Sequence, residues 1–216
     1  MTPAIRMPPH HPQEVVPVRR PGPPERDIHP LIADRWSPRA IDPARPVERA
    51  TLLTLLEAAR WAPSCFNDQP WRYLIFDLTN PRQLHAARDC LVEGNAWTRR
   101  APTLLLSVAR KTFRHNGKPN RMAVHDVGAA SALLCLQATA AGLVAHQMAG
   151  FDASLARERF HIPADCEVLA MIALGYPGDV ASLSESQQER ERAPRERLPL
   201  SEIAAEGDWE APLRED

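Results

Sequence analysis

The sequence lacks most of the motifs that mark nucleotide-dependent and hydrolytic enzymes. Only nine glycines occur in 216 residues and no two are spaced as G-x-G, which excludes the dinucleotide-binding fingerprint. There is no G-x-x-x-x-G-K-[ST] phosphate loop and no G-x-S-x-G nucleophile motif. No self-sufficient acid–base or nucleophilic site stands out either. These absences favour a protein whose chemistry is carried by a bound cofactor.

Cysteines are few and scattered. Cys65, Cys90, Cys135 and Cys166 form no C-x-x-C pair, and no histidine lies at ligand spacing from them. A zinc or other metal site is therefore not expected, and the thiols are expected to be reduced.

Neither sign of charge is in excess. The 26 Lys and Arg residues balance 27 Asp and Glu, giving a net charge of -1, so charge provides no argument for a nucleic-acid partner. No run approaches the length of about 18 apolar residues that a membrane span needs. The first residues also lack the apolar core of a secretory signal, so we expect a cytoplasmic protein without a membrane partner.

What the chain does contain is the composition of a folded domain, with 44% hydrophobic and 25% charged residues. Nine of the 22 prolines fall within the first 30 residues, where apolar periodicity is weak. We therefore predict a flexible tail over residues 1–27, one folded domain over 28–200, and a C-terminal extension over 201–216.

Helices and strands are both predicted within the folded domain. Apolar periodicity and end signals predict helices over residues 27–35, 47–61, 80–92, 122–141 and 153–160, and a helical turn over 184–191. Aromatic, β-branched or continuous apolar runs predict strands over 71–77, 103–109, 143–148 and 168–174. A polar loop is expected over 110–121. The fold class is therefore α+β or α/β.

Three polar clusters stand out. They are R-W-S-P-R at 35–39, P-S-C-F-N-D-Q-P-W at 63–71, and R-E-R-L-P at 195–199. Together the first and third carry four arginines, which would suit a phosphate through bidentate, charge-assisted hydrogen bonds. Each cluster alone is more typical of a solvated loop or a capped helix end, but their combination favours a binding site.

In order and spacing, these clusters resemble the successive motifs of the FMN-dependent nitroreductase family. H-Q-M-A-G-F-D at 146–152 and A-L-G-Y-P-G-D at 173–179 extend the resemblance, which covers residues 28–200. It implies an α+β homodimer with a central mixed sheet flanked by helices and two FMN sites at the subunit interface. It also implies ping-pong hydride transfer from NADH or NADPH, through flavin N5, to a nitroaromatic, quinone or other small electrophile.

The resemblance assigns the arginines to the cofactor. Arg35, Arg195 and Arg197 would hold the FMN phosphate, and Ser37 would bond the flavin or its ribityl chain. Arg39 would lie near flavin N1 and O2, where positive charge favours hydride uptake.

The second cluster would reach the flavin from the other subunit. Pro63, Ser64, Cys65 and Asn67 would contact the cofactor, with Asn67 bonding the flavin ring or the ribityl group. Gln69 would either join them or brace the loop. Cys65 has no adjacent base, so it is expected to pack as a small hydrophobe rather than to react.

A fourth segment would cover one face of the flavin ring. It consists of Gln147, Met148, Ala149 and Gly150, and the backbone N–H of Ala149 or Gly150 would reach N5. Many family members have a glutamate where this chain has Ala149. Because the expected N5 contact comes from the backbone, the change should alter the pocket rather than abolish the chemistry.

The connection over 110–121 is short, whereas many relatives insert helices there that cover the active site. Phe113, His115 and Asn116 either line the entrance or belong to a plain solvated loop. His146 either approaches the substrate or is a satisfied core histidine. Trp61, beside the second cluster, is expected in the core.

Two alternatives to nitroreductase chemistry remain open at this stage. One keeps the fold and changes the flavin reaction to dehalogenation, dehydrogenation or flavin fragmentation. The other is a flavin-binding protein that does not turn over. In each case we expect the apolar helix over 122–141 to form the dimer interface, so that a charge at Ala130 would disrupt the dimer.

Overall fold

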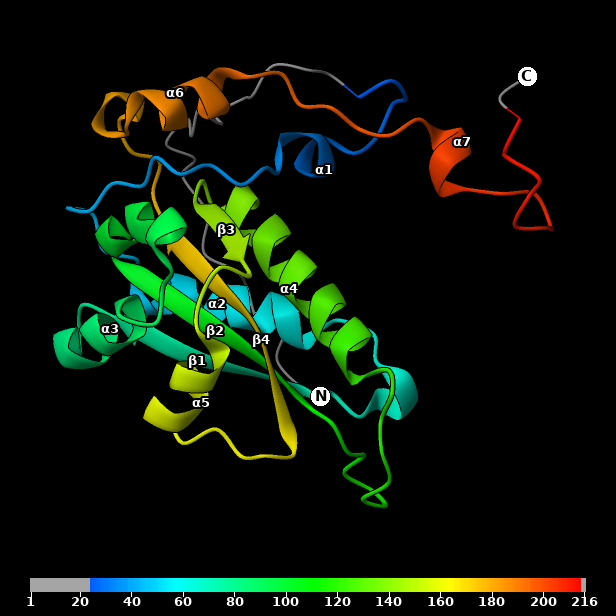
Figure 1. Cartoon of the computed structure of the whole chain (residues 1–216), viewed down its shortest axis with the longest axis horizontal. Coiled ribbons are helices and arrows are strands. Elements are labelled where there is room, and N and C mark those ends of the chain that lie inside the picture. Colours follow the sequence, from blue (N-terminus) through cyan, green and yellow to red (C-terminus); the bar gives the residue numbers. More distant parts are fainter. Residues whose placement is uncertain (1–23, 215–216) are drawn as a thin grey trace, which may run out of the picture.

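A four-stranded sheet forms the centre of the computed structural model, which describes residues 24–214 (Figure 1). In spatial order, the strands are β1 (Trp71–Asp77), β2 (Thr103–Arg110), β4 (Cys166–Gly175) and β3 (Val144–Met148). The expected α+β class is confirmed. One detail of the expected sheet is corrected, because all three strand pairs are antiparallel rather than mixed.

Helices surround this sheet. They are α1 (Pro30–Asp34), α2 (Arg49–Arg60), α3 (Pro81–Arg88), α4 (Ala123–Ala140), α5 (Ala153–Arg159), α6 (Glu185–Arg192) and α7 (Leu200–Ile203). Three short 3₁₀ segments connect them: η1 (Cys65–Asn67), η2 (Glu93–Arg100) and η3 (Val180–Ser182). The sequence signals do not indicate η2, because Gly94 and Asn95 are typical of the end of the preceding helix.

The start of α3 shows how local sequence sets an element. The side chain of Asn80 accepts a hydrogen bond from the backbone N–H of Gln83 at 3.2 Å, and Pro81 occupies the first turn. Both features follow the rules for a helix N-terminus, since the cap satisfies an unpaired donor and proline has none to lose.

The core lies on both faces of the sheet. Leu105 on β2 packs with the residues of α2 and α4, whereas Leu104 and Leu106 pack with those of α3 and α5. This explains why β2 reads as a continuous apolar run. The expectation that Trp61 lies in the core is wrong. Its side chain is 76% exposed at the end of α2, and its indole N–H donates to Glu57 at 2.8 Å.

The long helix α4 has one buried face and one exposed face. Ala130 is fully buried in the core of its own subunit, so the expectation that it lies at a dimer interface is wrong. The opposite face exposes Val124, Gly128 and Ala132. No helix among residues 24–214 has both the length and the apolar character needed to cross a bilayer.

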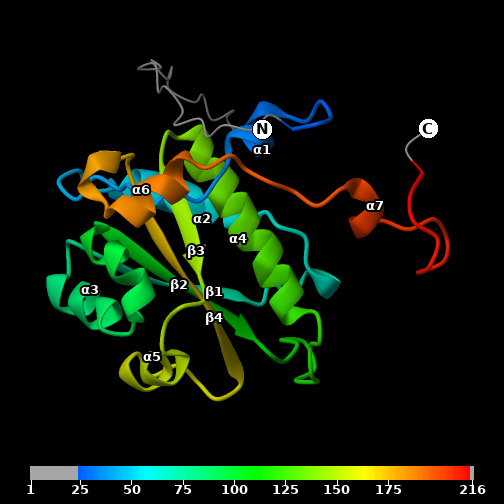
Figure 2. The same ribbon diagram turned by 45° about the horizontal axis from the view of Figure 1, so that its top comes forward.

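The C-terminal segment leaves the body of the subunit after α6. It runs beside α1, and α7 and the chain that follows stand away from the sheet (Figures 1 and 2). Ala205 and Pro212 pair across a turn whose Trp209 is 96% exposed. Most of the predicted tail, residues 1–23, lies outside the described residues.

Candidate functional site

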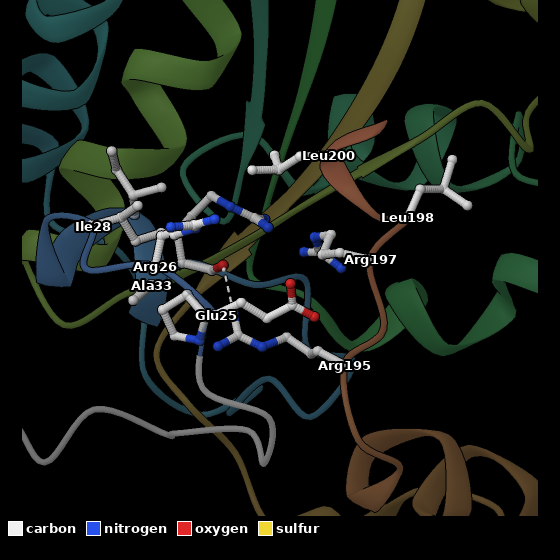
Figure 3. A pocket seen from close by; sticks show the side chains of 11 residues that line it. Glu25, Arg26, Ile28, Ala33, Arg195, Arg197, Leu198 and Leu200 are labelled. Carbon is white, nitrogen blue, oxygen red and sulfur yellow. Dashed lines mark hydrogen bonds between the residues drawn. The ribbon is translucent and has the colours of Figure 1, made fainter. Parts of the chain in front are cut away.

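Two arginine clusters that are far apart in sequence line one pocket. Arg35 at the end of α1, and Arg195 and Arg197 after α6, surround a pocket of about 370 Å³ (Figure 3). Arg195 donates to the backbone carbonyl of Arg35 at 3.4 Å across 160 residues of sequence. The pocket is also lined by Glu25, which carries the opposite charge. A cluster of guanidinium groups of this kind suits a phosphate.

The segment over residues 35–39 is tied internally and to α6. Arg35 Nη1 donates to Ser37 Oγ at 3.4 Å. The backbone N–H of Arg39 lies 3.1 Å from both carboxylate oxygens of Glu191, and Arg39 Nη1 lies 3.2 Å from Oε1. The Glu191 side chain is only 2% exposed. Sequence reasoning missed Glu191, because nothing distinguishes it from the other charged residues of α6.

His146 supports the same segment from β3. Its Nδ1 lies 3.1 Å from the carbonyl oxygen of Pro38, and its ring packs 4.7 Å from that of Trp97, centroid to centroid. Burial lowers the pKa of His146 to about 4, against the weaker opposing effect of the Pro38 hydrogen bond. The ring is therefore neutral at pH 7 and donates its Nδ1–H to Pro38. Of the two interpretations of His146, the satisfied structural histidine holds.

The chain just after β3 has a fixed backbone. The carbonyl of Gly150 accepts from the side-chain amide of Asn95 at 2.9 Å and from the backbone N–H of Val92 at 3.2 Å. A Cβ on Gly150 would collide with the Asn95 amide, which explains the glycine. Within residues 24–214, no acceptor is found for the backbone N–H of Ala149 or Gly150. These two donors are available to a ligand.

The two residues before them face in different directions. Met148 is buried in the core beneath the sheet, with 5% exposure. Gln147 is exposed, and its Nε2 lies 3.5 Å from Cys135 Sγ on α4. Burial raises the pKa of the Cys135 thiol to about 11, so this sulfur stays protonated and serves as a packing partner.

The loop that contains η1 has an unusual backbone. Phe66, Asn67 and Gln69 have φ of +52°, +53° and +52° without being glycine. Such left-handed residues each cost about 1–3 kcal/mol and tend to occur at functional sites. No sequence motif predicts these left-handed residues, because the strain arises from a tertiary arrangement of ordinary residues.

Hydrogen bonds hold this strained loop in place. Ser64 Oγ accepts from the backbone N–H of Gln69 at 3.1 Å. Gln69 Nε2 donates to Asn67 Oδ1, also at 3.1 Å, which places Gln69 as a brace for Asn67. The carboxylate of Asp126, at the start of α4, accepts from the backbone N–H of Cys65 at 3.0 Å. Pro63, at the entry of the loop, is exposed.

Three aromatic rings gather above this loop. Phe66 is 81% exposed, and its ring lies 5.8 Å from that of Phe113 and 6.0 Å from that of His115. Phe113 and His115 come from residues 110–121, which form a small hairpin closed by the bridge between Thr112 and Pro119. Asn116 Nδ2 contacts His115 Nε2 at 2.9 Å.

Asp68 joins the hairpin to the strained loop. Its buried carboxylate accepts from the backbone N–H of Arg114 at 2.7 Å. Asp68 therefore ties this hairpin to its neighbour, while most of residues 110–121 are exposed, as expected for a solvated loop.

The arginine pocket and the strained loop lie apart within one subunit. The loop binds Asp126 in the first turn of α4, whereas Gln147 contacts Cys135, nine residues further along the helix. At the rise of an α-helix, this separation is about 13.5 Å. In Figure 1, α1 lies beside the far end of α4, away from the loop that joins α2 to β1. One subunit alone does not bring all the expected site residues together.

The structure thus combines an α+β fold with a pocket lined by arginines from both ends of the chain. Sequence comparison is more specific. The model of the Nitroreductase family matches residues 32–88 and 78–176, which is more than half of the chain. The chain belongs to the nitroreductase family.

Individual relatives agree with this assignment. The NADH dehydrogenase of Thermus thermophilus is 28% identical over 189 residues, which cover 73% of this chain and 85% of that protein. An uncharacterised 15.4 kDa protein from the ask 5′ region of Mycolicibacterium smegmatis is 39% identical over 123 residues, which cover 57% of this chain and 82% of that protein.

Solved structures extend the match to most of the chain. A structure described as an oxidoreductase containing FMN superimposes with a TM-score of 0.82 at 37% identity, covering 88% of this chain and 96% of its own. A putative nitroreductase in complex with FMN from Desulfovibrio desulfuricans matches with a TM-score of 0.65 at 25% identity, covering 85% and 99%.

Proposed function

We propose that this protein is an FMN-dependent NAD(P)H oxidoreductase of the nitroreductase type. The observation that carries the proposal is the convergence of Arg35, Arg195 and Arg197 on one pocket. Support comes from the family match and from the similarity to an oxidoreductase that contains FMN. NADH or NADPH would donate the hydride, and a small electrophile would accept it.

The residues present fit the cofactor. The guanidinium groups of the pocket match the oxygens of a phosphate, and the hydroxyl of Ser37 lies at the edge of the same cluster. The available N–H groups of Ala149 and Gly150 suit a ring nitrogen that accepts a hydrogen bond. Bound FMN would supply the hydride chemistry. The chain's own contribution is to bind the phosphate, orient the ring and fix the donors.

The protein would work as a homodimer with shared sites. The strained loop carries Ser64, Cys65 and Asn67, and its contact with α4 at Asp126 lies more than two helical turns from the contact of Gln147 with that helix. The loop therefore lies away from α1 and the arginine pocket (Figure 1). A second copy can bring its loop to this pocket, which a single copy cannot. The exposed apolar face of α4, which includes Val124 and Ala132, supplies a surface for that contact.

The acceptor would be planar and aromatic, such as a nitroaromatic or a quinone. The rings of Phe66, on the loop that would face the partner's cofactor, and of Phe113 and His115, on the neighbouring hairpin, contact one another. An exposed phenylalanine on strained backbone weakens the lone subunit, so its presence is better explained by contact with a ligand. Offset or edge-to-face ring contacts would hold a planar acceptor there.

The decisive experiment is to identify the bound flavin and then assay turnover. The purified protein should be yellow, and heat should release noncovalent FMN that is recognised by chromatography. It should also oxidise NADH or NADPH with a nitroaromatic acceptor under steady-state conditions. Release of FAD, or a colourless protein that ignores added FMN, would contradict the proposal. Bound FMN without turnover would point to a binding protein.

A further inference from the structure

The helix α6 is polar throughout, yet one of its carboxylates is buried. Its sequence is E-S-Q-Q-E-R-E-R, and Glu191 is the single buried residue among these eight. A carboxylate is rarely buried unless it is paired and hydrogen-bonded. The position of Glu191 therefore reflects a specific partner rather than general packing.

That partner is Arg39, which Glu191 binds through backbone and side chain together. Both carboxylate oxygens lie 3.1 Å from the backbone nitrogen of Arg39, and Oε1 lies 3.2 Å from Nη1. The pair joins segments 152 residues apart in sequence. The backbone bond fixes the turn that carries Ser37, and the ion pair fixes the Arg39 guanidinium.

We propose that Glu191 is a positioning residue that latches the C-terminal segment onto residues 35–39. Arg195 and Arg197 follow Glu191 by four and six residues, so docking α6 through Glu191 brings both to the pocket beside Arg35. The latch thereby brings together the two sides of the pocket that the arginines line. Its consequence for FMN rests on the function proposed above, whereas its effect on the C-terminal segment does not.

The latch would also set the charge beside the cofactor. Arg39 is the residue expected near the flavin ring, and Glu191 opposes its charge at 3.2 Å. A carboxylate so close reduces the positive potential that Arg39 projects. Glu191 therefore holds Arg39 in place while limiting how strongly it favours the reduced cofactor.

Two substitutions separate these roles, and a third serves as control. Glu191→Ala removes both the acceptor and the charge, whereas Glu191→Gln keeps an acceptor and removes only the charge. Glu189→Gln makes the same charge change on an exposed side chain of the same helix. The readouts are peptide-resolved hydrogen exchange of the apo protein, FMN affinity by titration, and the midpoint potential of the bound flavin.

In Glu191→Ala, we expect exchange over residues 185–197 to accelerate at least about tenfold while strand β2 stays protected, because only the docked segment is released. FMN affinity should fall about tenfold or more as the arginines lose their positions. In Glu191→Gln, the exchange rate over residues 185–197 and the FMN affinity should each stay within about twofold of the parent. The midpoint potential should become more positive, by about 30 mV if the charge change favours the reduced form tenfold. Glu189→Gln should match the parent throughout.

Unchanged exchange over 185–197 in Glu191→Ala would overturn the latch. Equal losses in the Ala and Gln variants would do so too, since a positioning role requires rescue by the residue that keeps the acceptor. If Glu191→Ala does not fold, the Glu191→Gln potential decides, and an unshifted value refutes the charge role. If the parent itself binds no FMN, the proposed function fails while hydrogen exchange still tests the latch.

Discussion

A charge at Gly128 should separate the subunits without unfolding them. Gly128 is exposed on α4, and a Cβ built there meets no other atom within 4 Å. Replacing a helical glycine relieves the entropy cost of that residue, which is worth about 0.5–1 kcal/mol. The lone subunit should therefore tolerate Gly128→Glu or gain slightly in stability.

In the dimer proposed above, the same carboxylate would meet an apolar surface and its own symmetry mate nearby. Burying an unpaired charge costs several kcal/mol, and a penalty of about 3 kcal/mol per dimer weakens association roughly 150-fold. We expect Gly128→Glu to give a folded monomer that has lost FMN, because flavin that binds only the dimer leaves with it.

Sedimentation over a range of protein concentrations measures the dissociation constant, and flavin absorbance reports the cofactor in the same sample. Gly94→Glu is the matched control, since it adds the same charge at another glycine whose Cβ would meet open space. A Gly128→Glu protein that remains dimeric would exclude this face of α4 from the interface. A monomer that keeps FMN and turns over would refute the shared site.

Three further predictions follow from the geometry. Arg197→Ala should weaken FMN binding by about 10–150-fold in a titration, through the loss of a charge-assisted bond, whereas Arg192→Ala, outside the pocket, should leave binding unchanged. Phe66→Ala should raise KM for a quinone by about 2–10-fold at constant kcat and leave ferricyanide reduction unaffected. The pKa of His146 is about 4 in the folded protein, below its ordinary value, so the unfolded chain binds the proton more readily. Stability should therefore fall by up to about 3 kcal/mol as pH drops from 6.5 to 4, and urea unfolding should show a flatter profile for His146→Gln.

Local sequence patterns predict most of the helices and strands of the fold. The strand over 71–77 was predicted with its bounds intact, because aromatic and β-branched residues fill it and turn residues flank it. The helix at α4 was predicted within one residue at each end. Ala130, which is expected at the dimer interface, lies instead on the face that meets the core, since a helix rich in alanine gives no pattern that separates an interface from the core.

Contacts between residues far apart in the sequence cannot be predicted from local sequence patterns. The η2 segment exists because Trp97 packs on His146 and Asn95 binds Gly150, and those partners lie about 50 residues away. Glu191 is likewise defined by its bond to Arg39 across the chain. The family resemblance groups Arg35, Arg195 and Arg197, and all three line one pocket, whereas Arg39 does not line it. No sequence pattern indicates Glu191, the residue that docks the C-terminal arginines.

The strained loop is a feature that the proposed homodimer would explain. Phe66, Asn67 and Gln69 each hold left-handed backbone, and Phe66 and Gln69 carry most of the cost because asparagine adopts this conformation more readily. Hydrogen bonds to Ser64 and Asp126 keep the conformation in place, and Phe113 and His115 contact the Phe66 ring at its edge, yet that ring stays 81% exposed. In the proposed dimer, a further stabilising contact would come from the second subunit, at the end of α4 remote from the arginine pocket. A second copy placed with its own pocket against this loop would supply that contact, and the strain would then favour association and cofactor binding together.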